Sequence, residues 1–339
     1  MDGWAWAVRT GESRKWMPQH FQQTSYGENP IIMKRTRGQI PMERGTLSKK
    51  QFDLLTWIEK NGRATQREMA DHTGMSLGII NKTLYQLTEN GYLVNGGVTD
   101  KGFEALEPYR VKRAVFVAAG FGSRLVPITL NTPKPLVRVR GKRIIDTLLD
   151  AVTAAGIEEV YIIRGYLSEQ FDQLLYRYPG IKFIENPAFN EANNISSVMC
   201  ARYLLPNAYL LEADLLLSNP SLITKYQYTS NYLGVPVPMT DDWCFQTRNG
   251  WITSLSIGGT NCYRMFGISY WTEEDGTKLA KHVEQVYQSP GGKERYWDQV
   301  PLEYFADEYR VAVRECSFGD IAEIDTFREL KDIDPAYEI

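Results

Sequence analysis

The sequence predicts an α/β protein with a mostly parallel mixed sheet, preceded by a small helical domain. From Arg113 onwards, short apolar runs alternate with segments of helical spacing, as in right-handed βαβ units. Residues 47–108 instead carry helix start and stop signals and a glycine-rich turn. We therefore expect three parts: an N-terminal segment (1–46) that is partly disordered, the small domain (47–108) and the α/β domain (112–339).

Composition narrows the classes of protein. A chain of 339 residues with 43% hydrophobic residues and a net charge of -3 is too long for a peptide hormone and too acidic for a general polyanion binder. The four cysteines show no CxxC spacing, which argues against a zinc site or a disulfide framework. The N-terminus has no signal-peptide pattern, and no segment approaches the roughly 18 apolar residues of a membrane span. We expect a cytoplasmic protein without membrane insertion.

The small domain begins with a helix that Ser48 caps and that Asn61 and Gly62 end. A short helix (65–72), a tight turn, a second helix (76–89) and a hairpin through Asn95, Gly96 and Gly97 should follow. This order of elements resembles a winged helix-turn-helix module. Such modules read bases from the N-terminal part of the second helix, which here offers Ser76, Asn81 and Lys82.

The α/β domain should contain four early strands and the helices between them. The predicted strands are 114–120, 158–165, 181–186 and 208–214. The predicted helices are 143–156, 167–180 and 194–205. Because parallel strands end at one edge of their sheet, residues after these strands are candidates for a ligand site.

The first strand leads into the stretch GFGSRLVPITLNTPKPLV, which predicts a phosphate-binding loop. Gly120 and Gly122 would let backbone amides approach phosphate oxygens beside Ser123, and Arg124 and Lys134 add two cations. A dinucleotide fingerprint would need a third glycine at Leu125, and a Walker loop would need Gly-Lys before Ser or Thr. The loop therefore suits a nucleoside triphosphate better than a nicotinamide cofactor.

The same stretch resembles the signature GxGxRLxPxTxxxPKxL of the nucleotidyltransferases that activate phosphorylated small molecules. The resemblance covers about residues 113–330 and implies their Rossmann-like fold. The stretches GYLSEQFD, NNISSV, ERYWDQV and AEIDTFREL are similar, in the same order, to bacterial CTP:phosphocholine cytidylyltransferases. The resemblance thus implies condensation of CTP with phosphocholine to give CDP-choline and pyrophosphate.

The resemblance also implies roles for individual residues. Arg124 and Lys134 match the catalytic cations, and Asp214 and Asp325 match the carboxylates that bind Mg²⁺, with Glu212 and Glu323 as outer partners. The nucleoside should lie against backbone and polar side chains of one group of residues: Ala118, Ala119, Gly120, Gly122, Ser123, Asn194 and Ser197. Helix N-capping is an alternative role for Asn194.

The acceptor pocket is expected in the C-terminal half, where aromatic and acidic residues are interleaved. Quaternary ammonium groups bind to aromatic faces, so Trp243, Tyr270, Trp297 and Asp298 are the candidate choline-binding residues. Packing in the core is the alternative role for each aromatic residue.

Two other functions stay open on the sequence alone. The chain could be a sister enzyme for a sugar 1-phosphate or an aminoalkyl phosphonate. It could also be a transcription regulator whose transferase-like domain senses a ligand, although Arg124, Lys134, Asp214 and Asp325 argue against a degenerate site. DNA is the candidate partner of the winged module, and a protein contact that makes the chain a homodimer is the alternative; the wing is poor in cations.

Overall fold

The computed structural model describes residues 47–338, so the expectation for residues 1–46 lies outside the described part. No helix in the described part is both long and apolar enough to cross a bilayer. Two large hydrophobic clusters, an N-terminal cluster and a smaller fourth cluster form the core.

The N-terminal module has the expected helices and hairpin. Ser48 and Thr65 each form a capping box, Ser76 caps the third helix, and Gly74 ends the second in the left-handed conformation. Asn81 and Lys82 are exposed on the third helix. The elements are α1 (Lys49–Asn61), α2 (Gln66–Thr73), α3 (Leu77–Glu89), β1 (Leu93–Val94), β2 (Gly97–Val98) and α4 (Asp100–Leu106).

A seven-stranded mixed sheet forms the centre of the remaining chain, with the order β10-β12-β11-β8-β3-β6-β7. The pairs β8–β3, β3–β6 and β6–β7 are parallel, as expected, and β11 runs antiparallel to β8. The strands are β3 (Arg113–Val117), β6 (Glu159–Arg164), β7 (Ile181–Glu185), β8 (Ala208–Glu212), β10 (Asn231–Arg248), β11 (Trp251–Trp271) and β12 (Ala312–Glu315).

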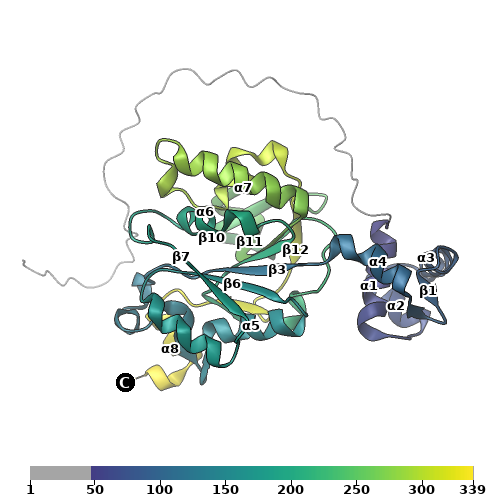
Figure 1. The fold of residues 1–339 in the computed structure, drawn as a ribbon, viewed down its shortest axis with the longest axis horizontal. Helices are drawn as coiled ribbons and strands as arrows, with labels where there is room; N and C mark the ends of the chain where they lie inside the picture. The colour runs from purple at the N-terminus through teal and green to yellow at the C-terminus, as the bar shows by residue number, and fades with distance from the viewer. Residues whose placement is uncertain (1–46, 339) are drawn as a thin grey trace, which may run out of the picture. The chain divides into compact units, whose positions relative to one another are not determined.

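Helices cover both faces of this sheet (Figure 1). Val115 and Phe116 point to opposite faces of β3, the first into the core beneath α6 and α7 and the second into the core beneath α5. The helices are α5 (Ile144–Ala154), α6 (Ile195–Ala201), α7 (Glu273–Gln288) and α8 (Phe327–Ile333). Two short pairs complete the strands: β4 (Arg138–Val139) with β5 (Lys142–Arg143), and β9 (Leu215–Leu217) with β13 (Ile321–Glu323).

Two segments differ from the expected elements. The predicted helix 167–180 is instead a 3₁₀ helix over Ser168–Tyr176, and the residue before it, Leu167, is in the left-handed conformation (φ 46°). The long hairpin of β10 and β11 was not predicted. It turns at Asn249 and Gly250, whose φ values of 53° and 77° match a two-residue hairpin turn.

The N-terminal module shares its core with a loop of the sheet domain. Tyr109 and Tyr226 belong to the same hydrophobic cluster as Leu54 and Ile80 of α1 and α3. Tyr228 stacks on Tyr109 with 5.3 Å between ring centroids. The hydroxyls of both tyrosines donate to the carbonyl oxygen of Leu47 at 3.2 Å. An ion pair of 2.6 Å between Lys225 and Glu59 lies beside them.

Candidate active site

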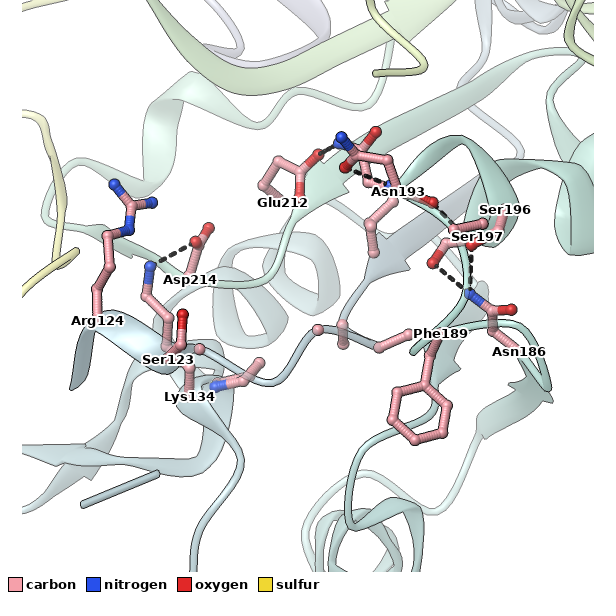
Figure 2. Close-up of a pocket in the computed structure, with 18 of the residues that line it drawn as sticks. Ser123, Arg124, Lys134, Asn186, Phe189, Asn193, Ser196, Ser197, Glu212 and Asp214 are labelled. Carbon is pink, nitrogen blue, oxygen red and sulfur yellow. Dashed lines mark hydrogen bonds and ion pairs between the residues drawn. The ribbon is translucent and has the colours of Figure 1, made fainter. Parts of the chain in front are cut away.

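The glycine loop follows β3 and forms one wall of a cavity of about 330 Å³ (Figure 2). Gly122 has φ 67°, and a Cβ atom there would lie 3.0 Å from Cβ of Lys134. Glycine is therefore required both by the backbone conformation and by the close approach of the two segments. The Thr129 hydroxyl donates to the Gly122 carbonyl at 2.9 Å, which holds the loop.

Lys134 links the glycine loop to two carboxylates. Its side chain is 9% exposed, and Nζ lies 2.7 Å from Oδ2 of Asp214 and 2.8 Å from Oδ1 of Asp325. Burial disfavours the ammonium, but the two carboxylates outweigh burial and raise the pKa of Lys134 above its ordinary value. Lys134 is therefore a fixed cation at neutral pH.

Arg124 provides the second cation. Nη2 lies 2.9 Å from Oδ1 of Asp325, and 66% of the arginine side chain is exposed. Two cations from one short stretch thus contact distant carboxylates: Lys134 pairs with Asp214, 80 residues further along the chain, and Arg124 pairs with Asp325, 201 residues further along.

Carboxylates from the middle and from the C-terminal part of the α/β domain meet at this point. The antiparallel pairing of β9 with β13 brings Glu323 and Asp325 beside Asp214, and one oxygen of each lies within 4.8 Å of the others. Burial and the neighbouring Asp214 and Asp325 raise the pKa of Glu323 to about 8. An all-oxygen donor set that already attracts the Lys134 ammonium fits a hard divalent cation such as Mg²⁺.

The opposite wall is polar and highly ordered by hydrogen bonds. Nδ2 of the buried Asn186 donates to the hydroxyl oxygens of Ser196 (2.9 Å) and Ser197 (3.0 Å). The Ser196 hydroxyl in turn donates a hydrogen bond to the backbone carbonyl oxygen of Asn193 at 2.7 Å. In the described chain, the Ser197 proton has no such acceptor, so this hydroxyl can donate to a ligand in the cavity.

Asn194 does not cap α6, because its side chain makes no capping hydrogen bond. Instead, Oδ1 accepts from the backbone amide of Trp297 at 3.0 Å, and Nδ2 donates to Oε1 of Glu212 at 3.3 Å. The residue thus joins the start of α6 to the end of β8 and to the segment that carries Trp297. The capping alternative is wrong for Asn194.

The structure brings together the predicted catalytic, metal and nucleotide residues in one cavity. The following predicted residues line it: Ala118, Ala119, Gly120, Gly122, Ser123, Arg124, Lys134, Asn194, Ser197, Asp214 and Asp325. Seven further lining residues were not among the predicted contacts: Val117, Pro135, Asn186, Phe189, Ala192, Asn193 and Ser196. The NNISS stretch signals two of them, whereas Asn186 carries no local signal beyond its position at a strand end.

The predicted acceptor residues lie elsewhere. Among the described residues that line the cavity, Trp243, Tyr270, Trp297 and Asp298 do not occur. Tyr270 is fully buried in β11 and packs edge-on against Tyr209. Trp297 is 1% exposed and packs with Tyr232 and Trp271. This placement favours core packing for Tyr270 and Trp297.

Asp298 and Trp243 differ from those two residues. Asp298 is buried and accepts a hydrogen bond from the Tyr232 hydroxyl, and burial raises the pKa of Asp298 to about 7. Trp243 is half-buried on β10, and its ring meets the more exposed ring of Tyr296 edge-on at 5.5 Å. Of the three aromatic residues expected to bind choline, only Trp243 is partly exposed in the described structure.

Comparison with known proteins agrees with this geometry. Residues 113–220 match the nucleotidyl transferase family, and residues 47–94 match the winged helix-turn-helix DNA-binding family. The chain is 35% identical to 2-aminoethylphosphonate cytidylyltransferase of Lancefieldella rimae over 66% of its own length and 92% of that protein. It is 31% identical to choline-phosphate cytidylyltransferase of Streptococcus pneumoniae over 65% of its length and 97% of that enzyme.

A solved structure agrees as well. The CTP:phosphocholine cytidylyltransferase from Streptococcus pneumoniae superposes with a TM-score of 0.62 at 30% identity, covering 67% of this chain and 99% of that one. The two curated relatives and the solved structure each match about two thirds of the chain. The winged module is matched separately, by the winged helix-turn-helix family. The chain therefore belongs to the cytidylyltransferase family of nucleotidyltransferases and carries a winged helix-turn-helix domain at its residues 47–94.

Proposed function

We propose that the protein transfers CMP from CTP to a small acceptor that has a phosphate or phosphonate at one end and an ammonium group at the other. An acceptor oxygen forms a bond to the α-phosphorus of CTP. The bond from that phosphorus to the bridging oxygen breaks, and its electron pair leaves with pyrophosphate. The observation that carries this proposal is Lys134, fixed between Asp214 and Asp325 at the end of the glycine loop.

The residues around Lys134 supply charge stabilisation and positioning. Phosphoryl-type transfers need neutralisation of negative charge more than covalent catalysis. Lys134 and Arg124 provide two cations, and the loop around Gly120 and Gly122 offers backbone amides. A phosphate monoester, whose second pKa is about 6, is already a dianion near pH 7 and needs no general base.

Mg²⁺ is the metal that we propose for this site. Asp214 and Asp325 would hold it, with Glu323 beside them. When bound, such an ion neutralises charge on the phosphates of the nucleotide and the acceptor. The Ser197 hydroxyl, oriented by Asn186, would donate a hydrogen bond to the nucleoside.

We favour a primary ammonium on the acceptor, as in an aminoalkyl phosphonate. A quaternary ammonium needs aromatic faces, and among the described lining residues Phe189 is the one aromatic side chain. The wall instead carries the carboxylates of Glu212, Asp214 and Asp325. The similarity to 2-aminoethylphosphonate cytidylyltransferase supports this choice.

Phosphocholine is the second candidate acceptor. The partial exposure of the Trp243 and Tyr296 rings supports it, and so does the similarity to choline-phosphate cytidylyltransferases. DNA remains the proposed partner of the winged module, since Asn81 and Lys82 are exposed on α3.

A pyrophosphate-release assay tests the proposal directly. Each of the four common NTPs would be combined with 2-aminoethylphosphonate, phosphocholine and glucose 1-phosphate, with Mg²⁺ present. We expect turnover with CTP and an ammonium-bearing acceptor, fastest with the phosphonate. Faster turnover of glucose 1-phosphate, or a clear preference for another NTP, would contradict the proposed function.

A further inference from the structure

Glu212 occupies a slot that the neighbouring strand leaves open. It is the last residue of β8, and its side chain lies against Gly267 of β11. In the antiparallel pairing of these strands Ile268 lies opposite Leu211, so the preceding residue, Gly267, lies beside Glu212. A Cβ atom at position 267 would lie 2.3 Å from Cγ of Glu212. Glycine at this position therefore makes room for the carboxylate side chain.

The hydrogen bonds of Glu212 fall on one of its two oxygens. Oε1 accepts from Nδ2 of Asn194 at 3.3 Å and from Nε1 of Trp297 at 3.2 Å, and both donors are neutral. In the part of the chain that the structure describes, no donor reaches Oε2 and no lysine or arginine pairs with this carboxylate. The carboxylate is thus oriented on one side and open on the other.

The surroundings of Glu212 increase the need for a cation. Asp214 lies two residues further along the chain, and the Lys134 ammonium beside it is already shared by Asp214 and Asp325. Removing a carboxylate from water without a cation is costly, and neutral hydrogen bonds compensate for only part of that cost. A positively charged ligand group would complete this corner of the cavity.

The position of Glu212 suits one end of a short acceptor. It lies two residues before Asp214, so the two Cα atoms are at most about 7 Å apart. Figure 2 shows Glu212 between the Lys134–Asp214 ion pair and the side chains of Asn193, Ser196 and Ser197. A small molecule with its phosphorus group at Lys134 could therefore place its other end at Glu212.

We propose that Glu212 binds the primary ammonium group of the acceptor through Oε2, while Asn194, Trp297 and Gly267 position its side chain. This inference rests on the proposed function and specifies which group selects the acceptor. A primary ammonium can donate a hydrogen bond to Oε2, which a trimethylammonium cannot. Glu212 is therefore the residue that would distinguish an aminoalkyl acceptor from an alkyl one.

The test pairs one side-chain change with one change in the acceptor. Wild-type protein and Glu212→Gln would be assayed with 2-aminoethylphosphonate and with propylphosphonate, in which a methyl group replaces the ammonium. A hydrogen bond to a charged group is worth about 10- to 100-fold in affinity. We expect wild type to prefer the aminophosphonate by that factor in kcat/KM, and Glu212→Gln to lose the preference with KM for CTP nearly unchanged.

Two further variants sharpen the test. Gly267→Ala should displace the Glu212 side chain and reduce the same preference while the carboxylate is retained. Glu158→Gln is the matched control: it makes the same chemical change at a side chain that is 85% exposed and lies before the amino end of β6, whereas Glu212 lies at the carboxyl end of β8. An equal loss with both acceptors in Glu212→Gln, or an intact preference, would overturn the inference.

Calorimetric titration separates this inference from the proposed function. Binding of 2-aminoethylphosphonate to the full chain requires no turnover, and melting temperatures would confirm that the variants are folded. If no NTP yields pyrophosphate but the aminophosphonate binds and Glu212→Gln weakens binding about 10-fold or more, the inference holds while the proposed function fails. Equal binding by wild type and Glu212→Gln would refute the ammonium contact.

Discussion

Two regions of the sheet domain are built differently: the aromatic cluster around Trp297, and the end of the cavity around Lys134, called the phosphate end because we propose that phosphate groups bind there. At the phosphate end, Lys134 and Arg124 are held by carboxylates that are open to the cavity. In the cluster, Trp297 packs between Tyr232 and Trp271, and it contacts the cavity wall only through its indole N–H, which donates to Glu212, and its backbone amide, which donates to Asn194. The phosphate end carries charged side chains that line the cavity. The aromatic cluster is core, and its hydrogen bond from Trp297 orients Glu212.

This difference shows why charged residues identify a site more reliably than aromatic ones. A buried lysine requires a partner of opposite charge, so Lys134 and the two aspartates that match the family's pattern constrain one another. An aromatic side chain can bury its apolar surface equally well against a ligand or in the core, so its position in the sequence does not distinguish the two roles. The three predictions below test whether the two regions are as distinct as they look.

The largest effect should follow removal of Trp297, and it should be an effect on stability. Trp297→Ala leaves a large cavity in a tightly packed core and should lower the free energy of unfolding by about 3–5 kcal/mol. Trp243→Ala, at the half-buried position on β10, is the matched control and should cost much less. Urea unfolding measures both. Equal losses would mean that Trp297 is not the core residue of the pair.

Removing the cation at the phosphate end should act on the rate. Lys134→Met should lower kcat/KM for CTP by about 100- to 1000-fold per mole of folded protein, because it removes a preorganised charge. Lys142→Met changes an exposed lysine in the same way and serves as the control. Pyrophosphate release gives the rate, and circular dichroism gives the folded fraction. Near-normal rates in Lys134→Met would exclude Lys134 from the transfer step.

The third effect is a pH dependence of stability, which is small within any one pH unit. Burial raises the pKa of Asp298 to about 7, so between about pH 4 and 7 the folded protein keeps a proton that the unfolded chain releases. The contribution of Asp298 to stability is therefore present at low pH and is lost as the pH rises, by at most about 1.4 kcal/mol per unit. Asp298→Asn removes this group.

Unfolding free energies at several pH values would check this prediction. Asp298→Asn should show a flatter profile between pH 4 and 7 than wild type. Tyr232, which donates to Asp298, and Glu212 are the nearest other titratable groups. A Tyr232→Phe control would show whether that hydrogen bond alone sets the slope. Identical slopes in wild type and Asp298→Asn would contradict the protonated, buried carboxyl.

Local signals predicted much of the fold and the phosphate end of the site. The caps at Ser48, Thr65 and Ser76 act within one helical turn, so the sequence identifies them directly. Gly122 and Lys134 belong to one short stretch, which fixes the loop with little help from the rest of the chain. The family relationship then locates Asp214 and Asp325 at strand ends.

The remainder depends on contacts between distant segments. Asn194 lies beside Trp297 only because α6 and the segment after α7 meet in the fold, so its local position suggested an N-cap instead. Gly267 makes room for Glu212 only through the register of β11 with β8. The long β10–β11 hairpin contains prolines, glycines and several register shifts, which obscure the alternation that marks a strand.

The tyrosine contacts of the winged module have a consequence for cooperativity. Because Tyr109 and Tyr226 complete the module's own hydrophobic cluster, the module and the sheet domain should unfold together in a single transition. Ligands of the cavity would then protect the winged module against heat as well, since any ligand that binds only the folded chain stabilises all parts of a cooperative unit. By the same linkage, a partner that binds only the folded winged module would raise the melting temperature of the catalytic domain.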